Sequence, residues 1–303
     1  MCPARRARSV ATMRPAHLPH RFVAAGFTVA ATLVAPTTAL AADAVYGGSS
    51  RDKDAIVLKT DAQSTTLRSI VIGWRASCDD GSWIPGGGTL TPAVPEPGFE
   101  PDPSELLVSQ NGKGRFKGTQ LSTRDFGDIA AGISVEIQGK LKPDRATGTV
   151  KVQVAIIDKA TGVTVTNCRV TQKWSASHAP GKVYGGTTSQ GAPVVLRLVA
   201  NRKRVSDIFL SWFGSCSPSG SHWSREHLGN FSVKANGSFG NPFTDELPLE
   251  DGGKRAYDYT FTGKLSKAAG KGRLQFKISE TDAAGVAGSA CDSGAVTWKL
   301  AST

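Results

Sequence analysis

An internal duplication is the feature that most limits what this chain can fold into. The tetrapeptide VYGG at 45–48 occurs again at 183–186, which is 138 residues later. At the same spacing, a Trp-x-x-x-Cys pattern in SIVIGWRASC (69–78) aligns with the same pattern in DIFLSWFGSC (207–216). A chain duplicated in this way is expected to form one structural unit twice.

The second half of each copy aligns at a smaller spacing. GKL at 139–141 matches GKL at 263–265, which is 124 residues later, and Trp174 then aligns with Trp298. The 14 residues that the second copy lacks are assigned to the segment 84–105, which is rich in Pro and Gly. Because insertions concentrate in surface loops, we expect 84–105 to be a loop.

Period-two alternation identifies strands in both copies. Apolar and polar residues alternate over 133–141 and 150–156, and the counterparts at 257–265 and 274–278 repeat the pattern. Such alternation is typical of strands with one buried and one wet face. No window has helical periodicity, and 34 glycines argue against a helical bundle. We therefore predict an all-β protein of two tandem antiparallel domains of seven or eight strands each. Either β-sandwiches or β-barrels would fit.

The residues before the first copy read as a signal peptide, 1–41. The apolar stretch FVAAGFTVAATLV (22–34) follows a basic leader and precedes Ala-Leu-Ala at 39–41, a small-x-small cleavage pattern. This stretch is too short for a comfortable membrane span. Either Met1 or Met13 fits as the start. We expect the mature chain to be secreted or associated with the cell envelope, without a membrane span.

The duplication also sets the expected domain boundaries. The first β domain covers 42–178, the segment 179–182 is a linker, and the second β domain covers 183–303. Without the signal peptide, 31 basic and 25 acidic residues remain, a net charge of +6. This moderate charge favours weak attraction to anionic polymers, and no motif for nucleic-acid binding is present.

Four cysteines remain in the mature chain, Cys78, Cys168, Cys216 and Cys291. An even number in an exported chain indicates two disulfides. Because each copy holds one early and one late cysteine, the pairs Cys78–Cys168 and Cys216–Cys291 are favoured among the three possible pairings. No C-x-x-C pair supports a zinc site or thiol exchange.

The opening of the second copy, GGTTSQGAPV (185–194), has a distinctive turn sequence. The residues that matter in it are Gly186, Thr187 or Thr188, Ser189, Gln190, Gly191, Pro193 and Val194. With the later GKGRLQFKI and CDSGAVTWKL, it resembles a secreted β-rich domain common in actinobacterial genomes, here as a tandem repeat. The resemblance implies the fold class and export, and no particular activity. The first copy reads GGSSRDKDAIV (47–57) instead, so we expect it to lose the side-chain hydrogen bonds of this turn.

No catalytic or metal-binding constellation stands out. The mature chain has three histidines, and His222 and His227 lie together after Cys216 without an obvious third ligand. Asp79 and Asp80 follow Cys78, and further acids punctuate 84–105; paired carboxylates can hydrolyse glycosides or bind calcium. An acidic, proline-rich segment is more simply a solvated loop. We therefore predict no catalytic residues, no metal and no cofactor.

Two tryptophans differ from the other four. Trp74, Trp174, Trp212 and Trp298 have the parity of core residues. Trp83 and Trp223 are expected to lie in polar loops soon after the first cysteine of each copy, so they are candidate ligand-binding platforms. The sequence thus favours an exported, non-enzymatic protein that binds anionic or polysaccharide envelope polymers. The alternative is a secreted hydrolase that acts on a polysaccharide or another envelope polymer.

Overall fold

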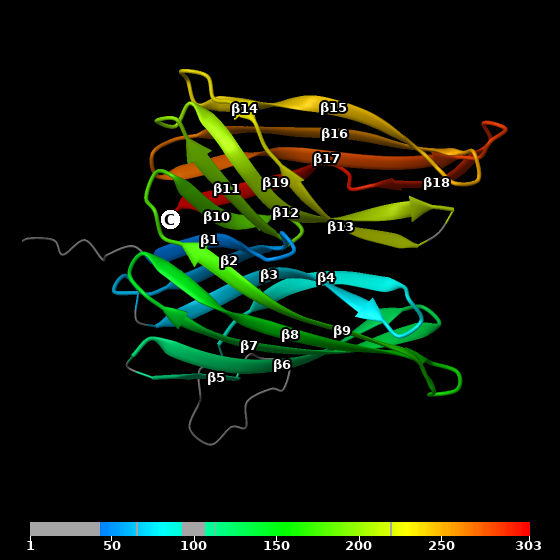
Figure 1. Cartoon of the computed structure of the whole chain (residues 1–303), viewed down its shortest axis with the longest axis horizontal. Coiled ribbons are helices and arrows are strands. Elements are labelled where there is room, and N and C mark those ends of the chain that lie inside the picture. The colour runs from blue at the N-terminus through cyan, green and yellow to red at the C-terminus, as the bar shows by residue number, and fades with distance from the viewer. Residues whose placement is uncertain (1–42, 65, 93–106, 112, 219) are drawn as a thin grey trace, which may run out of the picture. The chain divides into compact units, whose positions relative to one another are not determined.

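A computed structural model describes residues 43–64, 66–92, 107–111, 113–218 and 220–303 (Figure 1). Within these ranges the chain forms 19 strands in two antiparallel sheets and no helix, which confirms the all-β prediction. No helix able to span a membrane occurs in this part of the chain. The predicted signal peptide and residues 93–106 of the predicted loop lie outside the described residues.

The first sheet has nine strands in the order β4-β3-β2-β1-β9-β8-β7-β6-β5. Its strands are β1 (Ala44–Ser50), β2 (Ala55–Thr60), β3 (Leu67–Cys78), β4 (Trp83–Leu90), β5 (Leu107–Gln110), β6 (Arg115–Phe126), β7 (Ile129–Leu141), β8 (Arg145–Asp158) and β9 (Thr164–Ser177). Two meanders, β1 to β4 and β5 to β9, are joined where β1 pairs with β9.

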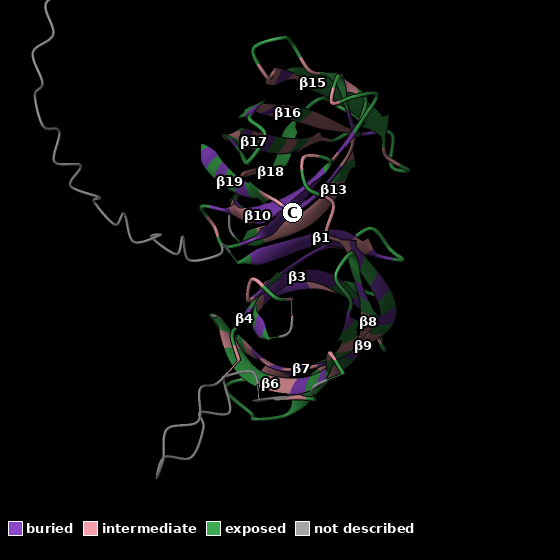
Figure 2. Cartoon of the chain, turned by 90° about the vertical axis from the view of Figure 1, so that its left-hand side faces the viewer, coloured by how far each residue is buried: buried purple, intermediate pink, exposed green. Residues whose placement is uncertain are grey.

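This sheet curls into a barrel, and its strands form a ring around one core (Figure 2). Among the described residues no ladder joins β4 to β5 or β6. Arg124 on β6 spans that seam, because its Nη2 donates a hydrogen bond of 2.6 Å to the carbonyl oxygen of Gly87 on β4. Of the two architectures that alternation allowed, the first copy therefore has the barrel.

The second sheet has ten strands and curls around its own apolar core, so we call it the second barrel. Eight follow the order β13-β12-β11-β10-β19-β17-β16-β15, while β14 pairs with β12 and β18 pairs with β12 and β17. The strands are β10 (Val183–Thr188), β11 (Pro193–Val199), β12 (Arg204–Ser217), β13 (Ser221–Leu228), β14 (Phe231–Ser232), β15 (Ser238–Pro248), β16 (Lys254–Leu265), β17 (Ala269–Thr281), β18 (Ala287–Asp292) and β19 (Val296–Ser302). Together β18 and β19 take the place of β9. Gly294, with φ of 66°, lies at the break between them.

Both predicted disulfides are present. Cys78 and Cys168 face each other in a short ladder between β3 and β9, and Cys216 and Cys291 do the same between β12 and β18. Each bond therefore links the same two positions of its barrel. The four tryptophans with core parity are also buried as predicted.

At one end of each core a tryptophan packs directly on a glycine of the neighbouring strand. A Cβ atom added at Gly148 would lie 2.5 Å from Cζ2 of Trp174, and one added at Gly272 would lie 2.3 Å from Cζ2 of Trp298. Each glycine is thus required for the indole to lie against the sheet. The two barrels share this end of the framework.

The outer faces of β1–β3 and β10–β12 pack against each other in a separate apolar cluster. Its main members are Val45, Val57 and Val71 from the first copy and Val183, Val195 and Phe209 from the second. Each member of the first set has its partner in the duplication in the second. The contact is therefore nearly self-complementary, like the interface of a two-fold dimer.

The hydroxyl hydrogen bonds of the opening turn occur in both copies, so their expected loss in the first copy is wrong, whereas within the described residues the side-chain bonds of Gln190 to Phe213 and of Ser189 to Thr297 are found in the second copy alone. Ser50 Oγ accepts the backbone N–H groups of Asp52 and Asp54, at 3.2 and 3.1 Å. Thr188 Oγ1 accepts two N–H groups in the same way. The hydroxyl is the group that the turn needs, and both Ser and Thr supply it.

Candidate functional site

The structure places Trp83 and Trp223 on strands, which corrects their assignment to polar loops. Trp83 is the first residue of β4, so the predicted loop 84–105 is wrong for 84–90. Its side chain is 52% exposed, and the Arg75 guanidinium lies 5.1 Å from the ring centroid. Trp83 is thus accessible, and a ligand-binding role for it stays a prediction.

Trp223 on β13 is half-buried against the first barrel. Its Cζ2 would lie 3.0 Å from a Cβ atom at Gly87, and the Arg124 guanidinium is 5.8 Å from its ring centroid. The ladders pair Trp83 with Ser77 and Trp223 with Phe213. The two tryptophans are therefore not equivalent in the two copies.

The strand register aligns HWSREH (222–227) of β13 with IPGGGT (84–89) of β4. Alternate side chains of β13 point to opposite faces. His222 and Glu226 face the core of the second barrel, whereas Trp223, Arg225 and His227 face the first barrel. Because His222 and His227 lie on opposite faces, they do not converge on one metal ion. No cluster of three metal-ligating side chains occurs among the described residues.

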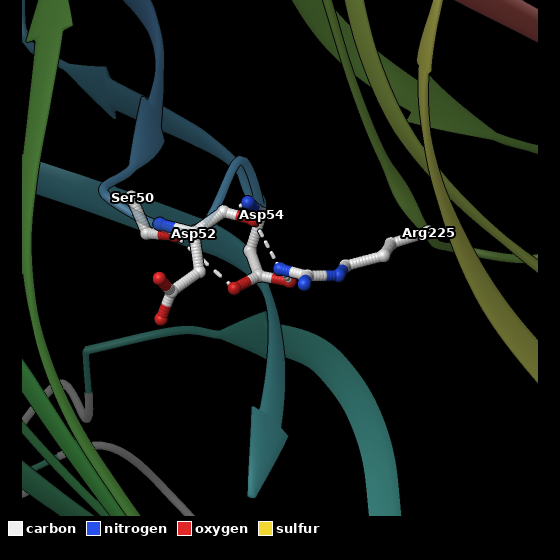
Figure 3. Close-up of polar contacts among 4 residues, drawn as sticks. All are labelled: Ser50, Asp52, Asp54 and Arg225. Carbon is white, nitrogen blue, oxygen red and sulfur yellow. Dashed lines mark hydrogen bonds and ion pairs between the residues drawn. The ribbon is translucent and has the colours of Figure 1, made fainter.

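Arg225 forms an ion pair between the two copies (Figure 3). Its Nη1 lies 3.1 Å from Oδ1 of Asp54 and also donates to the carbonyl oxygen of Asp52. Ser50 Oγ donates to the other carboxylate oxygen of Asp54 at 3.1 Å. The Asp54 side chain is 1% exposed and that of Arg225 is 23% exposed. Burial raises the pKa of Asp54, and the charge of Arg225 opposes this shift.

This ion pair occurs once, although the interface is nearly symmetric. Ala192 stands at the position of Asp54 in the second copy, and Gly87 stands at the position of Arg225 in the first. The contact therefore distinguishes one copy from the other. It is a polar contact that joins the two barrels.

Glu226 lies on the inner face of the second barrel. Its Oε1 accepts a hydrogen bond of 3.0 Å from Trp212 Nε1 and one of 3.1 Å from Ser224 Oγ. Burial raises the pKa of Glu226, although both hydrogen bonds act in the opposite direction. The carboxyl group therefore takes up a proton more readily than an ordinary glutamate.

Aromatic rings continue from Glu226 across the sheet. The centroids of Trp212 and Phe276 are 5.2 Å apart, those of Phe276 and Tyr259 are 5.2 Å apart, and those of Tyr259 and Phe243 are 4.9 Å apart. His222 approaches Trp212 from the other side, at 5.3 Å. Phe243, at the end of the run, is 48% exposed. Solvent thus reaches this part of the barrel.

A charged pair lies at the same end of the second barrel. Arg255 Nε donates to Glu280 Oε1 at 2.7 Å, and Ser289 Oγ donates to Glu280 Oε2 at 2.8 Å. The side chains of Arg255 and Glu280 are 41% and 29% exposed. Burial, with the positive charge of Arg255 adding to it, lowers the pKa of His222. We call this region the polar end, formed by His222, Glu226, Arg255, Tyr257, Tyr259 and Glu280.

The first barrel has no polar end. The ladder partners place Ile84, Gly88, Ala131, Ile133, Val135 and Ile156 at the six equivalent positions. Ala131, Ile133, Val135 and Ile156 are at most 8% exposed. The same framework is thus filled by a packed aliphatic core in one copy. In the other copy it is filled by titratable and aromatic side chains that solvent reaches.

The carboxylates that stood out in the sequence have local roles. Asp79 forms an exposed ion pair of 3.3 Å with Arg169, and Asp80 accepts the N–H and hydroxyl groups of Ser82 in a turn. The acids at 96, 100, 102 and 105 lie outside the described residues. Sequence reasoning missed Glu226 and Arg225, whose signal was the replacement of three glycines by Ser-Arg-Glu.

No protein-family model matches this chain, and no curated protein matches it either. A role for the polar end is therefore inferred from the chemistry of its own residues.

Proposed function

We propose that this chain is an exported, non-enzymatic protein that binds an envelope polysaccharide at the polar end of the second barrel. The observation that carries the proposal is the replacement of an aliphatic core by an accessible aromatic and charged surface at equivalent positions. Two disulfides support export, because such bonds persist in oxidising compartments. The resemblance of the opening turn to secreted actinobacterial domains supports the same location.

The chemistry of the polar end suits a sugar chain. A pyranose ring presents an apolar face that packs on aromatic rings, and a rim of hydroxyl groups that need hydrogen-bond partners. Phe243 and Tyr259 offer stacked rings near the surface. Arg255 and Glu280 offer charged donors and acceptors beside them. A mainly apolar surface with a few placed polar groups is the usual composition of a ligand site.

The cost of these residues to stability supports a role in binding. Placing a carboxyl group such as Glu226 at a core position is unfavourable unless its hydrogen bonds compensate. The first barrel folds with Gly88 at that position and with aliphatic residues around it. The fold itself therefore does not require the polar side chains.

Retention on immobilised cell-wall polysaccharide, chitin and cellulose tests the proposal. Phe243→Gln installs the residue that the register places at this position in the first barrel, Gln120. We expect it to weaken retention about tenfold, as the loss of an aromatic contact usually does. Glu226→Gln keeps an oxygen acceptor and removes the negative charge, so it tests whether that charge contributes to retention. Leu121→Gln makes a similar change on an exposed outer position of the first barrel and should leave retention unchanged.

Trp83→Ala separates the proposal from the earlier prediction of an exposed tryptophan platform. If Trp83→Ala abolishes retention and Phe243→Gln does not, the polar end is not the binding site. Release of soluble sugar from any of the fractions would instead favour the secreted hydrolase.

A further inference from the structure

A row of lysines crosses the outer face of the second barrel, away from the polar end. The ladders place Lys264 on β16 directly opposite Lys271 on β17, and Lys271 directly opposite Lys299 on β19. Neighbouring strands are about 4.8 Å apart, so three positive charges follow one another at roughly that spacing. Arg273 lies two residues further along β17 on the same face. We call these four residues the lysine row.

The lysine row has no acidic partner. No ion pair or hydrogen bond of its four side chains occurs among the described residues. The nearest acid on the same face of β16 is Asp258, six residues or roughly 20 Å from Lys264. Like charges directly opposite each other destabilise a sheet. The three lysines therefore work against folding, and the acid beside the next part of β17, Asp292, is engaged by Gln275 and Lys277.

A hollow covers this face of the second barrel. It has a volume of about 840 Å³, and Lys234, Thr262 and Thr297 line it together with the lysine row. All its charged lining residues are basic. Hydroxyl groups at Thr262 and Thr297 flank Arg273, so donors surround the positive charges.

The equivalent face of the first barrel lacks the row. There the ladders align Lys140 with Thr147 and Thr147 with Ser175, so one lysine stands where the second barrel has three. The hollow above it is smaller, at about 600 Å³, and Arg115 and Lys117 also line it. The sheet geometry is thus the same, and the fold does not impose three lysines on successive strands.

We infer that the lysine row is a second binding site, specific for an extended polyanion that lies across the strands and carries anionic groups at close spacing. Phosphate and carboxylate groups share the required chemistry, since both accept hydrogen bonds from ammonium and guanidinium groups. Lys264 and Tyr259 are five residues apart on β16 and point to opposite faces of the sheet, so this site is separate from the polar end. It does not depend on the proposed polysaccharide site.

The test measures binding of the mature chain to inorganic polyphosphate and to polyglutamate, by fluorescence anisotropy over a series of salt concentrations. The variant Lys271→Thr/Lys299→Ser installs the residues of the first barrel and should lower the affinity about thirtyfold. It should also reduce the slope of log affinity against log salt by about two. The matched control Lys140→Thr/Lys173→Ser removes the same charge from the first barrel and should retain the affinity. Cooperative thermal unfolding of both variants, at a temperature no lower than that of the natural chain, establishes that they fold.

Binding of polyphosphate alone assigns the site to phosphate groups, and binding of both polymers assigns it to closely spaced anions in general; either result supports the inference. The inference is overturned if neither polymer binds at physiological salt, or if both variants lose the same affinity. Competition by monomeric phosphate at an equal concentration of phosphate groups would also overturn it, because a row of charges favours a chain over single ions.

Discussion

At one end of each barrel the two copies pack in the same way, with Trp174 on Gly148 in the first and Trp298 on Gly272 in the second. At the other end they differ, because Val135 and Ile156 are replaced by Tyr259 and Glu280. Inside the barrel, the shared end of the core stabilises the framework, and the differing end is free to carry a site. Duplication thus separates the residues that the fold needs from those that only one copy uses.

The largest expected effects test the shared framework. Replacing both cysteines of a pair by Ala removes a cross-link with a sequence separation of 90 residues in the first barrel or 75 in the second. The chain-entropy relation gives a loss of about 4–5 kcal/mol in either case. Urea unfolding of C78A/C168A and C216A/C291A should therefore give nearly equal losses. A difference above about 2 kcal/mol would show that the two bonds do not play equivalent roles.

The next effect tests the tryptophan and glycine end. Gly148→Ala and Gly272→Ala each force a Cβ atom into the space of an indole ring and a backbone carbonyl oxygen. We expect each to lower the free energy of unfolding by about 3 kcal/mol, the upper part of the range for overpacking. Gly132→Ala on β7 is the control, because no atom lies within 4 Å of the added Cβ. If one of the two buried substitutions behaves like this control, the two barrels do not pack this end of the core in the same way.

The shared framework could be predicted from the sequence because its signals are local and repeated. The Trp-x-x-x-Cys pattern identified the two copies, and the presence of one early and one late cysteine in each copy led to the correct disulfides. The number of strands was underestimated, since the structure has nine and ten. One reason is that assigning 84–105 to a loop removed β4 from the count.

The polar end could not be predicted for a related reason. Treating 84–105 as an insertion left IPGGGT unaligned with HWSREH, so the replacement of Gly88 by Glu226 was not apparent. In addition, HWSREH has polar residues on both faces, and each of them is half-buried or exposed. Period-two patterns identify strands with one buried and one wet face, so they fail for this strand.

A smaller effect is expected at the ion pair that occurs once. Arg225→Ala leaves Asp54 buried without its positive partner and should cost about 2 kcal/mol, less than for a fully buried pair because Arg225 is partly exposed. Asp54→Ala should cost less, since Arg225 reaches solvent. The double variant should be less unstable than the sum of the two single variants. Additive losses would mean that the two side chains do not interact.

The ion pair between Asp54 and Arg225 also predicts that the stability of the fold depends on pH. Burial raises the pKa of Asp54 above its unfolded value, so its protonated form favours folding at low pH and that contribution is lost as pH rises through the folded pKa. Without Arg225 this loss should be larger. The deficit of Arg225→Ala relative to the natural chain should therefore shrink as pH falls through the raised folded pKa of Asp54 toward the ordinary aspartate value, in thermal unfolding across a pH series. A deficit that grows on acidification would contradict this assignment.

The smallest effect is expected for Glu226→Gln. Burial raises the pKa of Glu226, so ionisation of the natural side chain weakens folding as pH rises from the ordinary glutamate value through the folded pKa. Gln keeps an oxygen acceptor for Trp212 and carries no charge. The variant should be slightly more stable than the natural chain at neutral pH, and the difference should vanish at low pH. Greater stability of the natural chain at neutral pH would mean that the carboxylate is favourably paired.

The most direct test of the polysaccharide proposal is hydrogen–deuterium exchange of the mature chain with and without the retained polysaccharide fraction. The account predicts slower exchange on binding in the parts of β13, β15 and β16 that form the polar end, around 222–226, 243–247 and 255–259. The equivalent segments 84–88 and 131–135 of the first barrel should not change. Equal protection of both sets of segments, or protection confined to the strand around Trp83, would contradict the claim that only the second barrel carries the site.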